Sequence, residues 1–297
     1  MILKISIIIT THNRPEFLTK VLAGYLHQAR EPDQIVIADD GSGEDTRQLI
    51  EDYAQQAPFP VIHAWIPHTG QPRLSLNRNT ATKQAKCEYI VYTDGDCVPG
   101  PYFVYDHQQL AQPGWFVQGK RNFVTYKAIE NFTGQENYLE RLKLWMTGGL
   151  TKFRLTFRVP GLWREQFDLP GIRSCNLGVF RKDIEEINGW NEDFIGFWRQ
   201  DSEFALRLMR LGVRRKNATW SAFSYHLEHE KPRIQADIDR NDQLLKQAET
   251  APIFTPNGLA KVSEDSEQSP ILLNFEECRK NMESEAKQFP NTLRKSA

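Results

Sequence analysis

Two aspartates separated by one glycine, Asp94 and Asp96, are the residues of this sequence best suited to chemistry. They follow four apolar residues, 89–92, whose nearly continuous apolar character is typical of a strand covered on both faces in a parallel sheet. Ligands of open α/β sheets bind beyond the carboxyl ends of the strands. Gly95 lets the backbone approach a ligand closely, and the carboxylates offer hard oxygen ligands for Mg²⁺ or Mn²⁺, which bridge phosphates. A solvated turn is the alternative, because Asp and Gly are ordinary turn formers.

The composition is that of an ordinary globular protein. Its 297 residues are 40% apolar and 25% charged, with a net charge of -1, so the chain can bury a large core. There is no basic excess and no block of like charge, which argues against a nucleic acid partner. Four widely spaced cysteines without a CxxC pair are typical of reduced thiols rather than of a disulfide framework or a zinc site: Cys87, Cys97, Cys175 and Cys278.

No segment has the pattern of a membrane span or a targeting signal. No apolar run approaches the roughly 20 residues that cross a bilayer. Residues 1–10 enter a strand pattern directly and contain no small-residue cleavage site, so we expect no signal peptide. These observations predict a cytoplasmic protein.

Strand and helix patterns alternate through the first hundred residues. Strand patterns cover residues 4–10, 34–38 and 61–66 and resume at Tyr89, and helical spacing covers residues 17–26, 46–57 and 74–85. Asn13, followed by Pro15 and Glu16, has the pattern of a helix cap. The resulting βαβαβαβ order predicts an α/β fold with a parallel, doubly wound sheet.

The pattern changes beyond Pro99. Residues 153–170 are irregular, aromatic and basic, and a stretch of that length is more often a functional lid or binding loop than a simple connection. From about Thr250 the chain is polar and weakly patterned, so we expect a loosely attached or disordered tail. The other expected elements are strands over 115–124, 172–180 and 221–226, and helices over 136–145, 183–187, 201–211 and 237–248.

Eight motifs occur in an order that resembles the family 2 glycosyltransferases of the GT-A fold: SIIITTHNR (6–14), ADDGS (38–42), LNRN (76–79), TDGD (93–96), SCNLG (174–178), GWNED (189–193), FWRQDSEF (197–204) and YH (225–226). The order is similar to that of the transferase domains of bacterial chondroitin polymerase, and the second half also resembles the β-1,4-galactosyltransferases. Each motif alone is weak, but the ordered set is specific. The resemblance implies a GT-A domain over residues 1–235, with a nucleotide-binding half (1–99) and an acceptor-binding, catalytic half (100–235), followed by a C-terminal helix and loosely ordered tail (236–297).

The resemblance assigns a nucleotide-binding role to Thr10, His12, Arg14, Asp40, Arg78 and Asp94. His12 would stack on uracil, although a loop histidine is more often simply exposed. Asp40 matches the acid that accepts the uracil imide N–H, and capping the next helix is its alternative role. Arg78 would either bind phosphate or hold Asp94, the acid near the ribose or sugar, unless it is an ordinary surface arginine.

The resemblance also implies a site for Mn²⁺ or Mg²⁺. Asp96 matches the direct metal ligand, and His226 matches the histidine that completes the site from the last strand. His229 lies three residues further on and is a competitor for that role. The metal would neutralise the charge that develops on the leaving diphosphate.

Asp201 matches the family's general base, which removes the proton of the acceptor hydroxyl. A helix cap is the alternative. Relatives usually carry Glu before this Asp, and Gln200 in its place removes one anionic contact to the acceptor. Trp198 would form a platform for an acceptor sugar or pack in the core. Asn176 lies where the family lines the donor-sugar pocket.

These assignments predict a metal-dependent, inverting glycosyltransferase that moves a sugar from a UDP-sugar to a glycan or lipid-linked acceptor, in the synthesis of cell-surface polysaccharide. A non-catalytic nucleotide-sugar-binding subunit of a polysaccharide assembly complex is the second hypothesis. The basic, aromatic segment 152–164 would either contact the inner face of a membrane or close over the acceptor. Neither a GxxxxGK[ST] nor a GxGxxG motif follows the first strand, which argues against P-loop enzymes and nicotinamide dehydrogenases.

Overall fold

The first half of the chain has the strand and helix order that the sequence predicts. A computed structural model describes residues 2–152, 157–230, 234–260 and 271–274. Strands and helices alternate in the order β1 (Ile5–Thr11), α1 (Pro15–Leu26), β2 (Gln34–Asp40), α2 (Glu44–Gln56), β3 (Val61–Ile66), α3 (Leu74–Gln84) and β4 (Tyr89–Asp94). The strands are almost entirely buried, as expected for a sheet covered on both faces.

These four strands form a parallel sheet in the order β3-β2-β1-β4. Their register places Thr10 of β1 beside Ala38 of β2 and Asp94 of β4. Because parallel strands end at the same edge of a sheet, the loops that follow them meet there. The fold therefore brings Thr10, Asp40 and Asp94, three of the predicted nucleotide-binding residues, to one edge.

The second half extends this sheet and adds a smaller one. The main sheet has the order β12-β3-β2-β1-β4-β9-β6-β10-β8, and the smaller sheet has the order β5-β11-β7. The main sheet is mixed, because β9 is antiparallel to both β4 and β6. The elements of this half are β5 (Cys97–Pro99), α4 (Phe103–Leu110), β6 (Trp115–Gly119), β7 (Arg121–Val124), α5 (Tyr126–Ile129), α6 (Tyr138–Met146), β8 (Arg164–Gln166), β9 (Asn176–Phe180), α7 (Arg181–Glu186), α8 (Gln200–Arg210), β10 (Arg214–Ala218), β11 (Ser224–Leu227), α9 (Gln235–Ala248) and β12 (Ile271–Asn274).

The single strand predicted over residues 115–124 is wrong, because the chain changes sheets at Lys120. β6 pairs with β9 and β10 in the main sheet, whereas β7 pairs with β11 in the smaller one. A Cβ at Gly119 would lie 2.2 Å from Oδ1 of Asn176 and 2.4 Å from the carbonyl oxygen of Ala222, so this crossing requires glycine. The sequence does not predict β10 either, since its residues, RRKNA, have no strand pattern.

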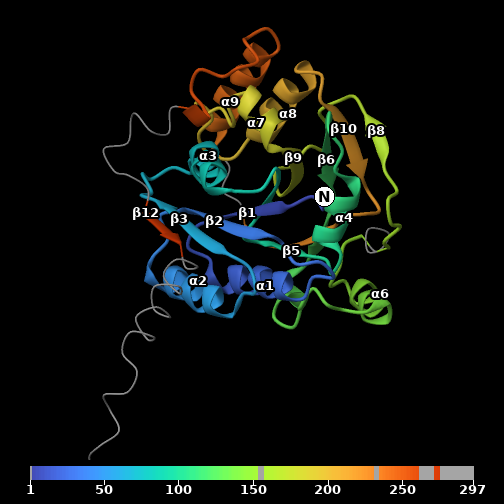
Figure 1. Ribbon diagram of the computed structural model, residues 1–297. Helices are drawn as coiled ribbons and strands as arrows, with labels where there is room; N and C mark the ends of the chain where they lie inside the picture. Colours follow the sequence, from blue (N-terminus) through green and yellow to red (C-terminus); the bar gives the residue numbers. More distant parts are fainter. Residues whose placement is uncertain (1, 153–156, 231–233, 261–270, 275–297) are drawn as a thin grey trace, which may run out of the picture.

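Helices cover both faces of the main sheet, with α1 and α2 on one face and α3, α7, α8 and α9 on the other (Figure 1). Side chains alternate along β1, so that Ile7 and Ile9 pack in the core under α1 and Ile8 packs in the opposite core. The two apolar cores make the sheet a rigid support for the loops at its carboxyl edge.

The smaller sheet brings β11 beside the Asp-Gly-Asp turn. β5 begins directly after Asp96, and β11 runs antiparallel to it with His226 opposite Cys97. The backbone N–H of Leu227 donates to the carbonyl oxygen of Asp96 (2.9 Å). The last predicted strand therefore exists, as β11, and carries His226 to the acidic turn.

A buried ion pair fixes α8, the helix that carries Asp201. The Glu203 carboxylate accepts from Nε (2.6 Å) and NH2 (2.8 Å) of Arg207, and both side chains are only 2% exposed. The same guanidinium donates to the carbonyl oxygens of Ile187 (2.6 Å) and Gly189 (2.8 Å), just after α7. The pair therefore ties α8 to the segment that follows α7.

Glu203→Gln is expected to lower the free energy of unfolding by about 3–5 kcal/mol, because it leaves the Arg207 charge buried without a counter-charge. Glu51→Gln is the matched control, since the Arg47–Glu51 pair has the same i,i+4 spacing but is solvent-exposed on α2. Its expected cost is below about 0.5 kcal/mol. Urea unfolding measures both, and equal losses would contradict the structural role of Glu203.

The chain beyond Thr250 is attached over its described part, so the expected loose tail is wrong there. Thr255 is buried, and the N–H groups of Leu259 and Ala260 donate to the carbonyl oxygen and Oδ1 of Asn188 (both 2.8 Å). β12 pairs antiparallel with β3 and so covers an edge of the main sheet. The rest of that predicted tail, residues 261–270 and 275–297, lies outside the described residues.

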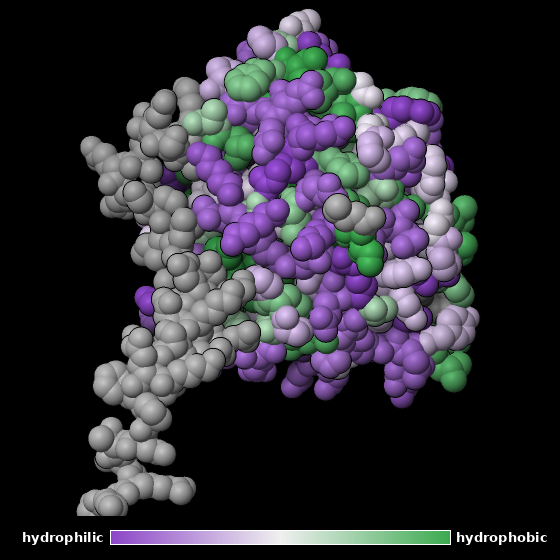
Figure 2. Space-filling model, viewed as in Figure 1, coloured by the Kyte–Doolittle hydropathy of each residue, from purple (hydrophilic) through white to green (hydrophobic). Residues whose placement is uncertain are grey.

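Within the part of the chain that the structure describes, no helix has the length and apolar character needed to cross a membrane. The face seen in Figure 2 is mostly hydrophilic, and its hydrophobic residues lie in small separate groups.

Candidate functional site

Asp94 is held in place at the end of β4. Its Oδ1 accepts from Oγ1 of Thr10 (2.9 Å) and lies 3.5 Å from NH2 of Arg78. Arg78 is buried, donates to Oγ of Ser174 (2.8 Å) and stacks over Trp190 at 4.7 Å. Of the roles considered for Arg78, the geometry favours the one that orients Asp94, and the surface role is wrong.

The turn between the two aspartates lies directly against β1. The N–H of Gly95 donates to the carbonyl oxygen of Thr10 (2.7 Å), and a Cβ at Gly95 would lie 3.0 Å from that oxygen. A side chain there would push the turn away from β1. Glycine therefore lets Asp94 and Asp96 stay next to the end of this strand.

Two histidines face Asp96. Oδ2 of Asp96 lies 2.6 Å from Nε2 of His229 and 3.4 Å from Nε2 of His226. The two imidazole rings are stacked, with centroids 5.3 Å apart and an interplanar angle of 17°. The ligand atoms of Asp96, Cys97 and His226 lie within 4.8 Å of one another, so these three could hold one ion, whereas His229 contacts Asp96 from outside this group. A carboxylate with an imidazole fits Mn²⁺ better than Mg²⁺, because Mg²⁺ strongly prefers oxygen ligands.

Two cysteines meet beside the acidic pair. Sγ of Cys97 donates to Oδ1 of Asp96 (3.1 Å), and NH1 of Arg121 donates to Sγ of Cys175 (3.1 Å). The hydrogen bond from Cys97, together with the Arg121 charge, lowers the pKa of Cys175, whereas burial raises the pKa of Cys97. The sequence does not predict this proximity, although Cys97 directly follows Asp96. Cys87 is also a free buried thiol, and Cys278 lies outside the described residues.

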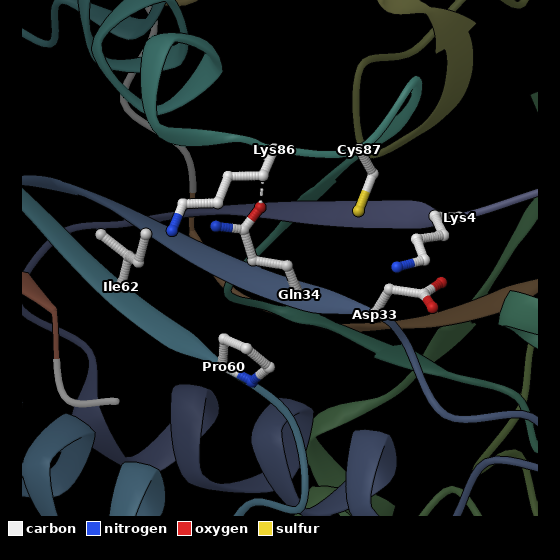
Figure 3. Close-up of a pocket in the computed structure, with 7 residues that line it drawn as sticks. All are labelled: Lys4, Asp33, Gln34, Pro60, Ile62, Lys86 and Cys87. Carbon is white, nitrogen blue, oxygen red and sulfur yellow. Dashed lines mark hydrogen bonds between the residues drawn. The ribbon is translucent and has the colours of Figure 1, made fainter. Parts of the chain in front are cut away.

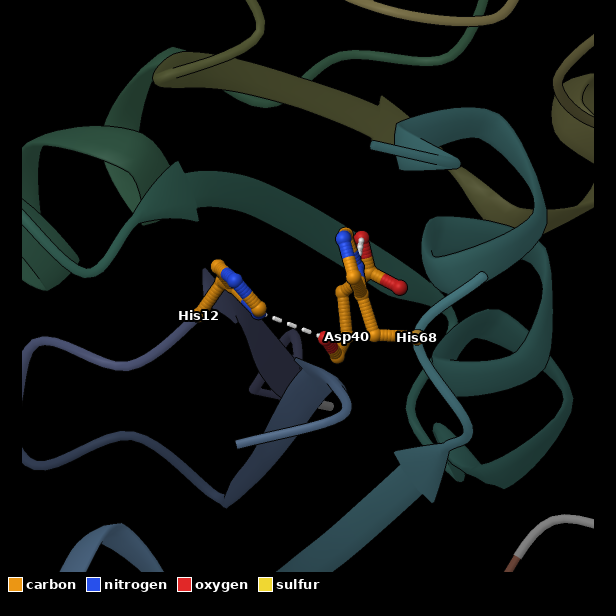
Figure 4. Close-up of side chains that lie close together, drawn as sticks. All are labelled: His12, Asp40 and His68. Atoms are coloured by element: carbon orange, nitrogen blue, oxygen red, sulfur yellow. Dashed lines mark hydrogen bonds and ion pairs between the residues drawn. The ribbon is translucent and has the colours of Figure 1, made fainter. Parts of the chain in front are cut away.

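His12, Asp40 and His68 lie together at the ends of β1, β2 and β3 (Figure 4). Nδ1 of His12 lies 2.6 Å from the carbonyl oxygen of Asp40, and Nδ1 of His68 lies 3.2 Å from Oδ2 of the same residue. The two rings stack at 4.4 Å. His68 lies in a loop without a motif, so the sequence does not predict its place in this cluster.

Asp40 keeps one oxygen without a partner. Its Oδ1 is buried and forms no hydrogen bond with any described residue. The alternative role as a helix cap is wrong, because Gly43 is the N-cap residue of α2 and the N–H of Ser42 bonds to Asp39 instead (2.9 Å). A buried carboxylate oxygen without a donor fits a site that receives an N–H from a ligand.

The predicted cap at Asn13 is wrong, because Arg14 is the N-cap residue of α1. Asn13 instead has a φ of 45° and links two loops: its N–H donates to Oγ of Ser42 (2.8 Å), and its Oδ1 accepts from the N–H of Gly43 (2.9 Å). Arg14, predicted to bind nucleotide, lies at the same edge as His12, and its guanidinium is 5.7 Å from the ring centroid of Phe17.

Asp201 lies in the first turn of α8, facing the same region as Asp94. Burial raises its pKa, the charges of Arg173 and Arg78 oppose that shift, and the charge of Asp94 adds to it. Asp201 is not the helix cap, since that position belongs to Arg199, whose φ is 68°. The structure therefore brings Asp201 within electrostatic reach of Arg78 and Asp94. Arg173 belongs to none of the motifs, so the sequence does not predict its place near Asp201.

The loop before α8 uses its polar side chains internally. Gln200 is buried, with Oε1 accepting from the N–H of Trp198 (2.9 Å) and Nε2 donating to the carbonyl oxygen of Gly196. Both ends of the Gln200 amide are therefore occupied, so its influence on a sugar would act through the shape of the loop. The half-buried Trp198 donates to Oδ1 of Asp242 (3.0 Å) and has the Arg199 guanidinium 4.8 Å from its ring. Its role as a sugar platform stays a prediction.

Asn176 joins three parts of the fold from inside. It is 1% exposed, and its Nδ2 donates to the carbonyl oxygens of Lys120 (3.1 Å) and Ala222 (2.6 Å). Its Oδ1 lies 2.9 Å from Nε2 of His107, and burial lowers the pKa of His107 to about 4. The neutral imidazole therefore donates to the amide. With all these groups occupied, the geometry does not support the predicted contact between Asn176 and a sugar.

A cavity of about 260 Å³ lies at the amino-terminal ends of the parallel strands, opposite the ends that carry Asp94 and Asp96 (Figure 3). It is lined by Lys4, Asp33, Gln34, Pro60, Ile62, Lys86 and Cys87. These residues lie mainly at the amino-terminal ends of β1, β2 and β4, and none of them belongs to the predicted site. The cavity is therefore separate from the edge that carries Asp94 and Asp96.

Comparison with known proteins identifies the family. The model of the family described as "Glycosyl transferase family 2" matches residues 6–186, and that described as "N-terminal domain of galactosyltransferase" matches residues 157–230. The chain is 26% identical to a hyaluronan synthase of Pasteurella multocida and 24% identical to a chondroitin synthase of Escherichia coli, each over 80% of this chain. It spans only 25% and 36% of the length of these relatives.

Solved structures share the fold. Residues 1–349 of S. aureus TarS match 83% of this chain, with 17% identity and a TM-score of 0.58, and the match covers 65% of that chain. Its complex with UDP-GlcNAc matches with a TM-score of 0.57. The predicted GT-A fold, the family resemblance and the likeness of the second half to galactosyltransferases are therefore confirmed. Because the first family model covers more than half of the sequence, this chain belongs to glycosyl transferase family 2.

Proposed function

We propose that this protein is a metal-dependent, inverting glycosyltransferase that moves a sugar from a UDP-sugar to a glycan or lipid-linked saccharide in the synthesis of cell-surface polysaccharide. The convergence of Asp94, Asp96 and Asp201 with two histidines at one edge carries the proposal. A non-catalytic binding subunit would not need a general base beside the acidic pair. Relatives named for hyaluronan and chondroitin synthesis support the polysaccharide class.

Each part of the site has a distinct task in this mechanism. Oδ1 of Asp40 accepts the imide N–H of uracil, which neutral cytosine lacks, and His12 supports the base by stacking. Thr10 and Arg78 orient Asp94 toward the ribose or sugar. Asp96 would hold a divalent ion together with His226 or His229. When bound, the ion acts as a Lewis acid that stabilises the leaving diphosphate.

Asp201 supplies the base. Its carboxylate takes the proton of the acceptor hydroxyl as the oxygen attacks the anomeric carbon, opposite the leaving UDP. A single displacement inverts that carbon, so an α-linked UDP-sugar gives a β-linked product. Proton NMR of the anomeric signal reports this outcome directly.

Release of nucleotide from UDP-, GDP- and CDP-linked sugars tests the class of donor. Turnover of UDP-sugars in preference to CDP-sugars is expected, because Asp40 accepts a ring imide N–H that neutral cytosine lacks. Preferential turnover of a CDP-sugar would contradict the role given to Asp40. If no donor turned over while UDP and Mn²⁺ bound normally, the binding-subunit hypothesis would replace the catalytic one.

The pH dependence of kcat/KM is expected to have an acid limb above the ordinary Asp pKa of 3.8, since burial raises the pKa of Asp201. The base acts only when deprotonated, so activity is lost as the pH falls through this raised pKa. Initial rates at saturating metal across the acid range measure the limb. An acid limb at or below 3.8 would show that another group acts as the base.

A further inference from the structure

A group of three cationic side chains lies on the side of the site where Asp201 lies: Lys120, Arg173 and Arg215. A Cβ on Gly171 would lie 3.4 Å from Nζ of Lys120 and 3.6 Å from NH2 of Arg215, so both head groups face the same stretch of backbone. The pKa of Lys120 is lowered to about 8. Burial is the largest cause, followed by the charges of Arg215, Arg164, Arg173 and Lys152. Like charges this close repel one another unless an anion lies among them.

Arg215 has donors that the protein does not use. Its side chain is fully buried on β10, where NH1 donates to the carbonyl oxygens of Asp168 (2.6 Å) and Pro170 (3.2 Å). Nε and NH2 are also buried, and neither has a hydrogen-bond partner among the described residues. Buried donors are nearly always satisfied, so these two atoms indicate an acceptor that the chain does not supply.

Apart from Asp201, which the charge of Arg173 reaches, few acids lie near the group. The Asp168 carboxylate lies 3.8 Å from NH1 of Arg215 and is 63% exposed, so water screens its charge. Glu165 is already paired with Arg214 (2.6 Å) on the neighbouring strand. Over the described ranges, no carboxylate lies within ion-pair distance of Lys120. The group therefore keeps an excess of positive charge around recessed donors.

The position of the group relates it to the acceptor rather than to the donor. Lys120 directly follows β6, which runs in the same direction as β4 because both strands pair antiparallel with β9, so it lies at the edge that carries Asp94. There the charge of Arg173 lowers the pKa of Asp201, the residue assigned to the acceptor hydroxyl. The uracil site lies instead at Asp40, across the first three strands. An anion bound by the group would thus belong to the molecule whose hydroxyl reaches Asp201.

We propose that Lys120, Arg173 and Arg215 bind an anionic group of the acceptor saccharide, a carboxylate or a phosphodiester, and so direct its hydroxyl toward Asp201. This inference rests on the proposed function and names the acceptor class of that same site. Guanidinium and ammonium groups bind both anions through charge-assisted hydrogen bonds.

Calorimetric binding to the full chain, with UDP and Mn²⁺ present, tests this proposal. The probes are a hexasaccharide of alternating N-acetylhexosamine and glucuronate, its carboxyl-reduced neutral form, and a short poly(alditol phosphate). At least one anionic probe is expected to bind about tenfold or more tightly than the neutral one. Equal binding of all three, or binding of neither anionic probe, would overturn the proposal.

Variants assign the preference to the group. Lys120→Gln and Arg173→Gln are each expected to weaken binding of the anionic probe about tenfold, with little effect on the neutral one. They carry the test because Arg215 is buried and its replacement would disturb folding. Arg214→Gln is the matched control: it removes the adjacent charge of β10, which is exposed and paired with Glu165. An equal loss in all three variants would indicate a general charge effect and overturn the assignment.

Two further measurements separate the possible failures. The first is flotation with anionic vesicles. If flotation depended on Lys120 and Arg173, and the saccharides showed no difference in binding, the group would be assigned to a membrane surface and the proposal would be overturned. UDP binding is measured in the same calorimeter. Loss of UDP binding with intact anion preference would contradict the proposed function alone, whereas intact UDP binding without anion preference would contradict this inference alone.

Discussion

Replacing Asp201 by Asn is expected to reduce sugar transfer about 10²–10⁴-fold and to leave UDP binding nearly unchanged. The amide keeps the shape of the side chain and can still accept the N–H of Ser202, which lies 2.8 Å from Oδ1. It cannot remove a proton from the acceptor hydroxyl. Rates of transfer at saturating donor and acceptor, with UDP affinity measured separately, report the two effects.

Asp45→Asn is the matched control for this variant. Asp45 is the second residue of α2, as Asp201 is the second residue of α8, so both carboxylates face the positive end of a helix dipole. The control therefore reproduces any loss of helix stability without touching the site. If Asp201→Asn retained wild-type transfer, or if both variants lost activity equally, Asp201 would not be the base.

Asp96→Ala is expected to lower metal-stimulated transfer at least about 10²-fold, because the charge on the leaving diphosphate would lose its main stabiliser. UDP affinity with Mn²⁺ should fall to the affinity measured without metal. Calorimetry of UDP with and without Mn²⁺ separates this effect from misfolding. An unchanged response to Mn²⁺ in the variant would place the metal elsewhere.

Calorimetry with Mn²⁺ also distinguishes the roles of the two histidines at Asp96. Both rings approach Oδ2 of Asp96, at 2.6 Å for His229 and 3.4 Å for His226. Each histidine is replaced by Ala in turn. If the histidine only orients the Asp96 carboxylate, Mn²⁺ binding is expected to weaken about 10–100-fold, and if it is a direct ligand, binding should weaken more. His27→Ala, at the exposed end of α1, is the control and should leave Mn²⁺ binding unchanged.

The sequence predicts those parts of the site that follow from strand order. Contiguous apolar runs identify β1 to β4, and the parallel connection then brings Thr10, Asp40 and Asp94 to one edge without knowledge of any side-chain contact. His226 is placed instead by the family resemblance, because β11 reaches the acidic turn through its pairing with β5, which is distant in the sequence. For Thr10, Asp40 and Asp94, strand order alone is enough.

The sequence does not predict features that depend on contacts between distant segments. Asn176 lies in a family motif, yet its amide is oriented inward by His107 and Ala222, 69 and 46 residues away. The break at Gly119 arises from the close approach of Asn176, which no local pattern contains. Arg173 and His68 lie in loops, where the direction of a side chain depends on tertiary packing. The proposed acceptor side of the site consists mainly of such segments, so it can be recognised only from the structure.

The most direct test of the central claim is the rate of UDP release from the preferred UDP-sugar, measured after chelation of metal and again after addition of Mn²⁺ or Mg²⁺. The proposed site predicts no release above background in the chelated protein and full recovery with Mn²⁺, with weaker recovery with Mg²⁺ because two imidazoles face Asp96. A rate that is unchanged by chelation would contradict a catalytic metal at Asp96, and with it the mechanism proposed for this edge of the sheet.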